Sequence, residues 1–211
     1  MTAALRILAA GPGVTVQDSG RIGWSRWGVT GCGAMDLAAL RLANRALGNP
    51  PDAAAIEVSL AGLELEAEGA PLDLAVVGGA FAVALDGRPL PPAAAFTLSP
   101  GHRLTLRAGP RGAFAVVAVA GTLDLAPVLG SRSTHTRSRL GGLDGRALRS
   151  GDRLAVDAPR RTLAVAAAID AAFLDGDGRP IRVALGPQAD HFAPETIARF
   201  LAQDWRLSPR S

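Results

Sequence analysis

The sequence contains no lysine and no tyrosine, and its single cysteine is Cys32. All 22 basic residues are therefore arginines. Without lysine the chain can form neither a Walker-type phosphate-binding loop nor a Schiff base with a substrate. A single cysteine also excludes an internal disulfide framework and a multi-cysteine metal site.

Aromatic residues and long apolar runs are also scarce. Aromatics make up 4% of the chain, the net charge is +3, and the arginines are scattered singly or in pairs. Nucleic-acid-binding proteins usually concentrate basic residues on one face with aromatics between them, so we expect no nucleic-acid partner. No apolar run approaches the roughly 20 residues of a membrane-spanning helix, and the first ten residues lack a convincing signal-peptide cleavage site. We therefore expect a cytoplasmic protein with no membrane contact.

What the chain does have is a pattern of short strands separated by turns. Hydrophobic residues make up 48%, and there are 25 glycines and 15 prolines. Leu63, Leu65 and Ala67 alternate with glutamates, which is typical of a half-buried strand. Asp86-Gly87 is a two-residue hairpin signal. Further strands are expected at 6–9, 14–17, 72–77, 81–85, 96–98, 103–107, 114–120 and 163–169. This spacing predicts a mainly β barrel or sandwich.

Two segments have helical spacing instead. Residues 36–47 begin with Asp36 as a capping residue and are followed by Gly48 and two prolines, which end a helix. Residues 194–205 carry a proline near the first helical position. A strand is expected at 181–185, and the polar run 175–178 is interpreted as a turn or linker, because it lacks the later glutamate of a calcium loop.

Three polar segments lie beside glycines, at 17–23, 31–36 and 130–146. Glycine lets a backbone approach a ligand, and arginine next to Ser and Thr suits carboxylate or phosphate binding. The alternative is that these are structured loops with surface arginines.

Cys32 precedes a helix, where a thiolate is stabilised, but with every histidine distant in sequence we favour a small buried cysteine. The histidines are isolated and form no zinc pattern, so we expect no metal site.

The polar segments also carry a family resemblance. The relevant runs are Gly11-Pro12-Gly13, Val16-Gln17-Asp18-x-Gly20-Arg21-x-Gly23, Gly33-Ala34-Met35-Asp36, Leu42-Ala43-Asn44, Gly48-Asn49, Ile56-Glu57, Val128 to Thr134, Gly141-Gly142-x-x-Gly145-Arg146, and Val183-x-x-Gly186-Pro187-Gln188-x-Asp190-x-Phe192. In this order they resemble the biotin-dependent carboxyltransferase family, which includes the C component of 5-oxoprolinase and the second component of allophanate hydrolase. Cys32 stands where that family usually has serine, and His135 where it usually has an aromatic residue.

The resemblance implies a cyclophilin-like β-barrel with one or two helices, followed by an incomplete second cyclophilin-like barrel. On this basis we expect a first barrel subdomain at 1–158 containing the helix 36–47, a strand and linker at 159–179, and the start of the second, truncated barrel at 180–211. We expect the open second barrel to make the chain prone to self-association, and residues 1–158 to behave better.

The resemblance also implies three alternative functions. The first is a subunit of an ATP-dependent 5-oxoprolinase, which hydrolyses the cyclic amide 5-oxoproline to glutamate. ATP would be used through the assembled complex. Its partners would resemble the B component of 5-oxoprolinase, which carries carboxyltransferase subdomains C and D, and the A component. The second is the biotin-dependent carboxyltransferase component of a urea carboxylase/allophanate hydrolase type system, with biotin carried on a partner. The third is a non-catalytic regulatory subunit that antagonises a kinase inhibitor.

Candidate site residues follow from the matched motifs. The candidate catalytic residues are Asp18, Asp36 and Glu57, whose carboxylates would orient a nitrogen or act as a base. The candidate substrate-binding residues are Gln17, Arg21, Asn44, Ser131, Arg132, Ser133, Thr134, Arg146 and Gln188. We expect Arg21 and Arg132 to line one anion-binding cleft at the mouth of the first barrel.

Overall fold

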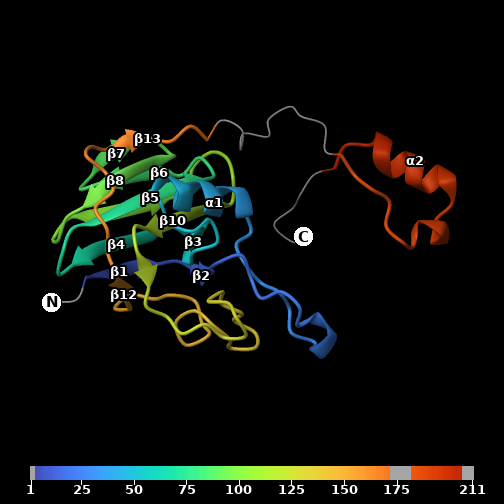
Figure 1. The fold of residues 1–211 in the computed structure, drawn as a ribbon. Coiled ribbons are helices and arrows are strands. Elements are labelled where there is room, and N and C mark those ends of the chain that lie inside the picture. The colour runs from blue at the N-terminus through green and yellow to red at the C-terminus, as the bar shows by residue number, and fades with distance from the viewer. Residues whose placement is uncertain (1–2, 172–181, 206–211) are drawn as a thin grey trace. The chain divides into compact units, whose positions relative to one another are not determined.

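The computed structural model describes residues 3–171 and 182–205. The chain forms two compact units, residues 1–175 and 176–211. The first unit is mainly β and consists of two antiparallel sheets and one helix (Figure 1). The mainly β fold predicted from the turn spacing is therefore confirmed.

The first sheet has seven strands in the order β11-β12-β1-β4-β9-β6-β7. Their bounds are Ala4–Ala10 (β1), Leu63–Glu68 (β4), Ala82–Leu85 (β6), Arg88–Leu90 (β7), Arg103–Arg107 (β9), Thr122–Leu123 (β11) and Arg153–Asp157 (β12). In β4 the leucines and alanine are buried while the glutamates are partly exposed, as the alternation predicted. These glutamates pair with arginines of β1, β9 and β12. The predicted hairpin joins β6 to β7, with φ of 49° at Asp86 and 77° at Gly87.

The second sheet has six strands in the order β13-β8-β5-β10-β3-β2. Their bounds are Thr15–Gln17 (β2), Ala55–Ser59 (β3), Leu72–Gly78 (β5), Ala94–Leu98 (β8), Phe114–Val119 (β10) and Ala167–Ala168 (β13). One face packs on the first sheet, and the shared core includes Leu5, Ile7, Ile56, Leu65, Leu74 and Val117. The other face forms a second apolar cluster with the helix. The central strands β5 and β10 are thus buried on both faces, which explains their continuous apolar sequences.

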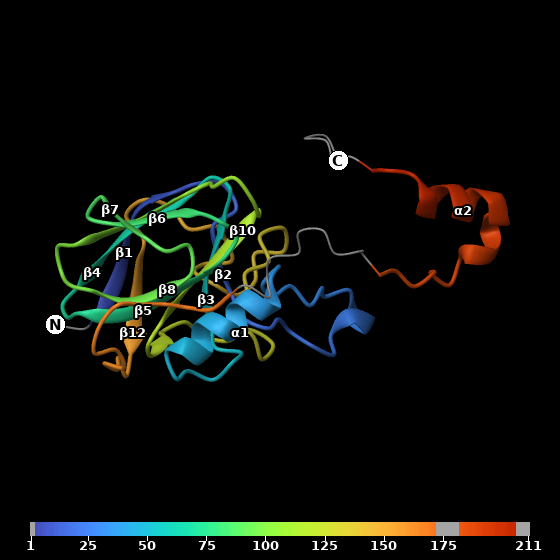
Figure 2. The same cartoon turned by 90° about the horizontal axis from the view of Figure 1, so that it is seen from above.

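The helix α1 spans Leu37–Ala46 and covers the outer face of the second sheet (Figure 2). Asp36 caps its first turn by accepting a hydrogen bond from the Ala39 N–H at 2.9 Å. Leu40 lies on its buried face and Leu47 directly follows its last residue; both belong to the apolar cluster against the second sheet, where the helix contacts β5 and β10. The prediction of a helix at 36–47 is confirmed, with its ends one residue shorter.

Residues 158–171 cross the same outer face beside α1, and we call this segment the strap. Its anchor is Asp73 on β5, a fully buried carboxylate. Asp73 accepts hydrogen bonds from the backbone N–H groups of Thr162 at 2.6 Å and Leu163 at 2.9 Å. Of the expected strand 163–169, only Ala167–Ala168 pairs with β8, and the Leu163 N–H bonds to this carboxylate instead. The first unit therefore extends past residue 158.

The second unit is described over residues 182–205. It contains a short 3₁₀ turn, η3, at Ala189–His191 and the helix α2 at Pro194–Ala202, with the proline in the first turn as predicted. The strand expected at 181–185 is wrong over its described part, since no described residue of this unit forms a strand to pair with. The linker expected at 175–178 lies outside the described residues. Within the parts of the chain described, no helix is long and apolar enough to cross a membrane.

Candidate functional site

Two of the polar loops meet where β2 ends. The carbonyl of Val16 accepts hydrogen bonds from both the N–H and the hydroxyl of Thr134, each at 2.9 Å. The amide nitrogen of Gln17 donates to the carbonyl of Thr134 at 3.2 Å and to the hydroxyl of Thr15 at 2.9 Å. These contacts join residues more than a hundred positions apart, so the predicted loops 17–23 and 130–146 lie side by side.

Asp18 is the centre of this junction. Its Oδ1 accepts hydrogen bonds from the hydroxyls of Ser131 and Ser133, both at 2.6 Å, and from the Gly20 N–H at 2.8 Å. Its Oδ2 accepts from the Arg132 N–H at 2.6 Å. Burial acts to raise the pKa of Asp18, but these hydrogen bonds outweigh it and hold the pKa below its usual value. Asp18 is therefore a charged acceptor with both oxygens occupied, which suits an organising role rather than that of a base.

Arg21 lies beneath the same junction and is only 2% exposed. Its Nη2 donates to the carbonyl of Ser133 at 2.5 Å and its Nε to that of Val128 at 3.3 Å. Its Nη1 is buried with no hydrogen-bond partner in the described part of the chain. Gly141 leaves room for this side chain, because a Cβ there would lie 2.7 Å from Nη2. The two loops meet as expected, but Arg21 braces carbonyls and does not face an open cleft.

Arg132 is the more accessible of the two arginines. Its side chain is partly buried and its Nε donates to the carbonyl of Leu125 at 2.7 Å. Among the described residues it forms no ion pair. Its two terminal amino groups bond to no described residue and can bind an anionic ligand, whereas the unpartnered Nη1 of Arg21 is buried.

The segment 31–36 packs onto the same junction. The Arg21 N–H donates to the carbonyl of Gly31 at 2.7 Å, and the Ala34 N–H donates to that of Asp18 at 2.9 Å. Cys32 is exposed, with φ of 53°, so the expectation of a buried cysteine is wrong. Within the described residues, no group of three or more His, Cys, Asp or Glu is arranged to hold a metal ion.

Glu57 lies beside the start of α1 and is 7% exposed. Its Oε2 accepts the Met35 N–H at 2.5 Å. Burial raises the pKa of Glu57, the Met35 bond opposes this, and the negative charge of Asp36 adds to the rise. Asp36 itself is the helix cap. Of the three candidate catalytic carboxyls, Glu57 is the one whose environment favours taking and releasing a proton.

Three other predicted site residues are not at this junction. Asn44 is fully buried and donates to the carbonyl of Ala53 at 2.8 Å, while accepting from the Asn49 amide at 3.0 Å. It therefore fixes the loop that follows α1. Arg146 is held by Asp152 through two hydrogen bonds of 2.7 and 2.8 Å. This bidentate pair raises the pKa of Arg146 and lowers that of Asp152.

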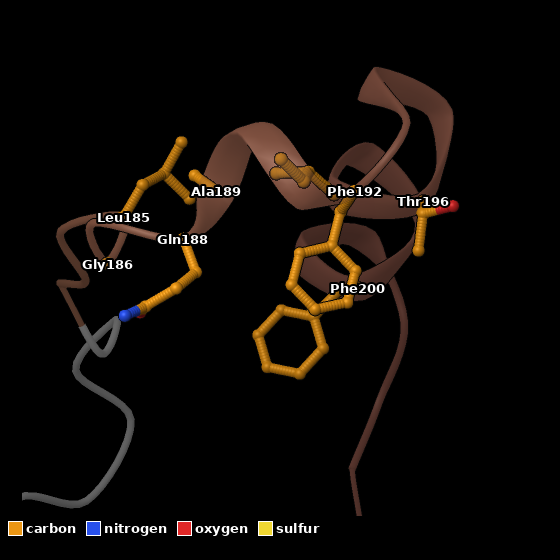
Figure 3. Close-up of a pocket in the computed structure, with 8 residues that line it drawn as sticks. Leu185, Gly186, Gln188, Ala189, Phe192, Thr196 and Phe200 are labelled. Atoms are coloured by element: carbon orange, nitrogen blue, oxygen red, sulfur yellow. The ribbon is translucent and has the colours of Figure 1, made fainter.

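Gln188 belongs to the second unit. There it lines an apolar hollow of about 310 Å³ together with Phe192, which directly follows the 3₁₀ turn, and Phe200 of α2 (Figure 3). Both phenylalanines are more than half exposed. Gln188 is thus next to apolar side chains of its own unit.

Sequence reasoning missed several residues that the structure makes central. Asn49 and Asp152 each hold a partner that was predicted to bind substrate. Asp73 anchors the strap. The available signal was weak, since Asp73 is one polar residue in an apolar run, Asn49 and Asp152 each follow a glycine, and the partner of each is set by the tertiary fold.

Comparison with known proteins identifies the family of the chain. A family model described as "Carboxyltransferase domain, subdomain A and B" matches residues 27–211. The chain belongs to this family. The resemblance found in the polar motifs is thereby confirmed.

Two curated relatives illustrate the range of the family. The chain is 36% identical over 207 residues to the C subunit of 5-oxoprolinase from Escherichia coli, covering 98% of this chain and 66% of that protein. It is 32% identical over 218 residues to urea amidolyase of Lachancea kluyveri, covering 97% of this chain and 12% of that protein. The chain thus spans just under two thirds of the first relative and a small part of the second.

Solved structures agree with this assignment. A crystal structure of TTHA0988 matches with a TM-score of 0.76 and 32% identity, over 93% of this chain and 38% of that one. The crystal structure of the K. lactis urea amidolyase matches with a TM-score of 0.71 and 33% identity, over 79% of this chain and 10% of that one.

Proposed function

We propose that this carboxyltransferase-family protein is a cytoplasmic subunit of an ATP-dependent 5-oxoprolinase. The observation that carries the proposal is its 36% identity to the C subunit of a 5-oxoprolinase across 98% of its length. The proposal is supported by the polar junction around Asp18, because this junction holds the loop that carries Arg132. ATP would be consumed by the assembled complex, with partners like the A and B components of 5-oxoprolinase, because a lysine-free chain has no Walker-type loop.

The reaction of this proposed enzyme is the hydrolytic opening of a lactam, the cyclic amide 5-oxoproline. Water adds to the ring carbonyl, the C–N bond breaks, and the nitrogen takes a proton to give the amino group of glutamate. The substrate also carries a carboxylate. The terminal amino groups of Arg132 suit that carboxylate as a bidentate partner, and Glu57 suits the proton transfer. Asp18 and Arg21 would keep the Arg132 loop in place.

The test is a reconstitution. The full chain, the B-like partner and the A-like partner are purified, and glutamate formed from 5-oxoproline is measured with and without ATP. We expect ATP-dependent glutamate release only when all three are present. Equal turnover without this chain, or no turnover by a stable three-protein complex, would contradict the proposal.

A second candidate is carboxyl transfer from biotin to a urea-like nitrogen. The observation that favours it is the 32% identity to urea amidolyase over 97% of the chain. In that case backbone N–H groups or Arg132 would stabilise charge on carboxybiotin. Bicarbonate fixation that requires urea and is abolished by avidin would select this function over the hydrolase.

A further inference from the structure

A projection from the first unit is formed by residues 20–33, which we call the finger. In both views its blue ribbon extends away from the two sheets, with a short helical turn at the tip (Figures 1 and 2). Its base is closed by the Arg21 N–H to Gly31 carbonyl bond of 2.7 Å. Gly20 and Gly33 pack so closely there that a Cβ on Gly20 would lie 2.6 Å from the carbonyl oxygen of Cys32. The finger is therefore fixed to the buried junction below it.

The tip is also ordered by its own contacts. Ser25–Trp27 form a 3₁₀ turn, η1, in which the Trp27 N–H bonds to the carbonyl of Trp24 at 2.9 Å. The rings of Trp24 and Trp27 lie 5.2 Å apart, and the guanidinium of Arg26 lies 3.7 Å from the Trp27 ring centre. This stack orders two indoles and a cation before any partner arrives, which lowers the entropy lost on binding.

Three large apolar side chains are exposed on the finger or directly beside it. Ile22 is 88% exposed, Trp27 57% and Met35 70%. Large apolar side chains exposed to this degree in one short segment are typical of a protein-binding surface. Trp and Arg are also the residues that most often carry the binding energy of an interface.

The unpaired charge around the finger is positive. Neither segment 19–35 nor segment 125–143 contains an Asp or Glu. The exposed arginines of this region include Arg26 on the finger, and Arg137 and Arg139 on the neighbouring loop. Asp18, between the two loops, is buried, and the exposed carboxylates at their edges, Asp52 and Asp144, pair with Arg41 and Arg146. The complementary surface is thus an apolar centre with an acidic rim.

We propose that the finger is the docking element that inserts into an acidic-rimmed apolar cleft of the B-like partner. The identity of that partner rests on the proposed function, while the chemistry of its cleft follows from the finger. A protein fits better than a nucleic acid, because Trp27 already contacts Trp24 and Arg26 rather than offering free ring faces to bases.

The test measures the Kd of the full chain for the purified B-like partner by titration calorimetry, at low and high salt. Two variants alter the tip, Trp27→Ala and Arg26→Glu. Two matched controls are Leu60→Ala, 56% exposed, and Arg88→Glu on β7. Leu60 directly follows the last residue of β3. The finger is near the other end of this strand, where Ala55 pairs with Gln17. Each tip variant should weaken binding at least about 30-fold, roughly 2 kcal/mol, with melting temperature unchanged and the controls within about twofold of wild type.

The outcomes separate the two proposals. If the wild-type chain does not bind the B-like partner at all, the proposed function fails and the docking assignment with it. If the wild type binds and both tip variants bind equally well, the finger is not the docking element, while the proposed function stands. Binding of a single-stranded oligonucleotide that the tip variants abolish, with partner binding intact, would also overturn the assignment. Added salt should weaken the wild-type complex more than the Arg26→Glu complex.

Discussion

Asp18 and Ser133 are joined by two hydrogen bonds: the Asp18 N–H donates to the Ser133 hydroxyl at 2.9 Å, and that hydroxyl donates to Asp18 Oδ1 at 2.6 Å. The two residues are 115 positions apart in the sequence. The pair therefore fixes one polar loop against the other. It also places Arg132 between two side chains that are both bound to the same carboxylate, Ser131 and Ser133.

Asp18→Asn should destabilise the first unit by about 2–4 kcal/mol, because an amide cannot accept all the bonds that the buried carboxylate accepts. Urea unfolding followed by circular dichroism measures this. Asp124→Asn is the matched control, since Asp124 is exposed, and should change stability by less than about 0.5 kcal/mol. Equal stability of the Asp18→Asn variant and wild type would show that the junction does not depend on the charge.

The difference in stability between wild type and Asp18→Asn should depend on pH. The pKa of Asp18 is lowered in the folded state, so its contribution is complete above the unfolded-state pKa of about 4. It is lost as pH falls through the folded-state pKa. The stability difference between wild type and Asp18→Asn should therefore be constant near neutral pH and shrink in acid. A difference that grows below about pH 4 would have the wrong sign.

Local elements of this fold could be predicted from the sequence. The helix was marked by Asp36 at its start and Gly48 at its end, and the β6–β7 hairpin by Asp86-Gly87. Each signal acts within a few residues of the element it specifies. The site was harder to predict from the sequence. The residues around Arg21 in the sequence do not distinguish an arginine that lines a cleft from one that bonds to the carbonyls of Val128 and Ser133. That choice depends on which distant loop covers it.

Arg21→Lys and Arg132→Lys should differ in their effect on folding. Lysine cannot reach both carbonyls that Arg21 bridges, so Arg21→Lys should lower stability by about 2–3 kcal/mol. Arg132 is partly exposed and bonds one carbonyl, so its change should cost about 1 kcal/mol or less. Thermal unfolding of both variants checks this. Similar melting temperatures for the two would contradict the assignment of Arg21 to bracing.

Glu57→Gln should stabilise the protein at neutral pH. The pKa of Glu57 is raised in the folded state, so folding is penalised once pH exceeds the unfolded-state pKa, and the neutral amide avoids the penalty. The melting temperature should rise by about 2–4 °C at pH 7, and the gain should vanish below the unfolded-state pKa. The assembled enzyme should lose activity with this variant, since glutamine cannot transfer a proton. A lower melting temperature at pH 7 with unchanged turnover would refute both roles.

The strap predicts where the first unit can be shortened. A chain ending at residue 158 lacks Thr162 and Leu163, whose N–H groups bond to Asp73, and so leaves a buried carboxylate without these donors. It should melt on the order of 5–10 °C below a chain ending at residue 175. We therefore expect the better-behaved piece of the chain to end at residue 175 and not, as expected from the sequence, at residue 158. Differential scanning calorimetry of the two chains decides between them, and equal melting temperatures would show that the strap adds no stability.

The central claim is that the surface built on Asp18 presents Arg132 to the substrate. The most direct measurement is kcat/KM for ATP-dependent glutamate release by the reconstituted complex carrying Arg132→Lys, beside the exposed control Arg88→Lys. We predict a loss of about 10- to 100-fold for Arg132→Lys, because lysine cannot form a bidentate pair, with partner binding unchanged and the control near wild type. Turnover of the Arg132→Lys complex within about twofold of wild type would contradict the claim.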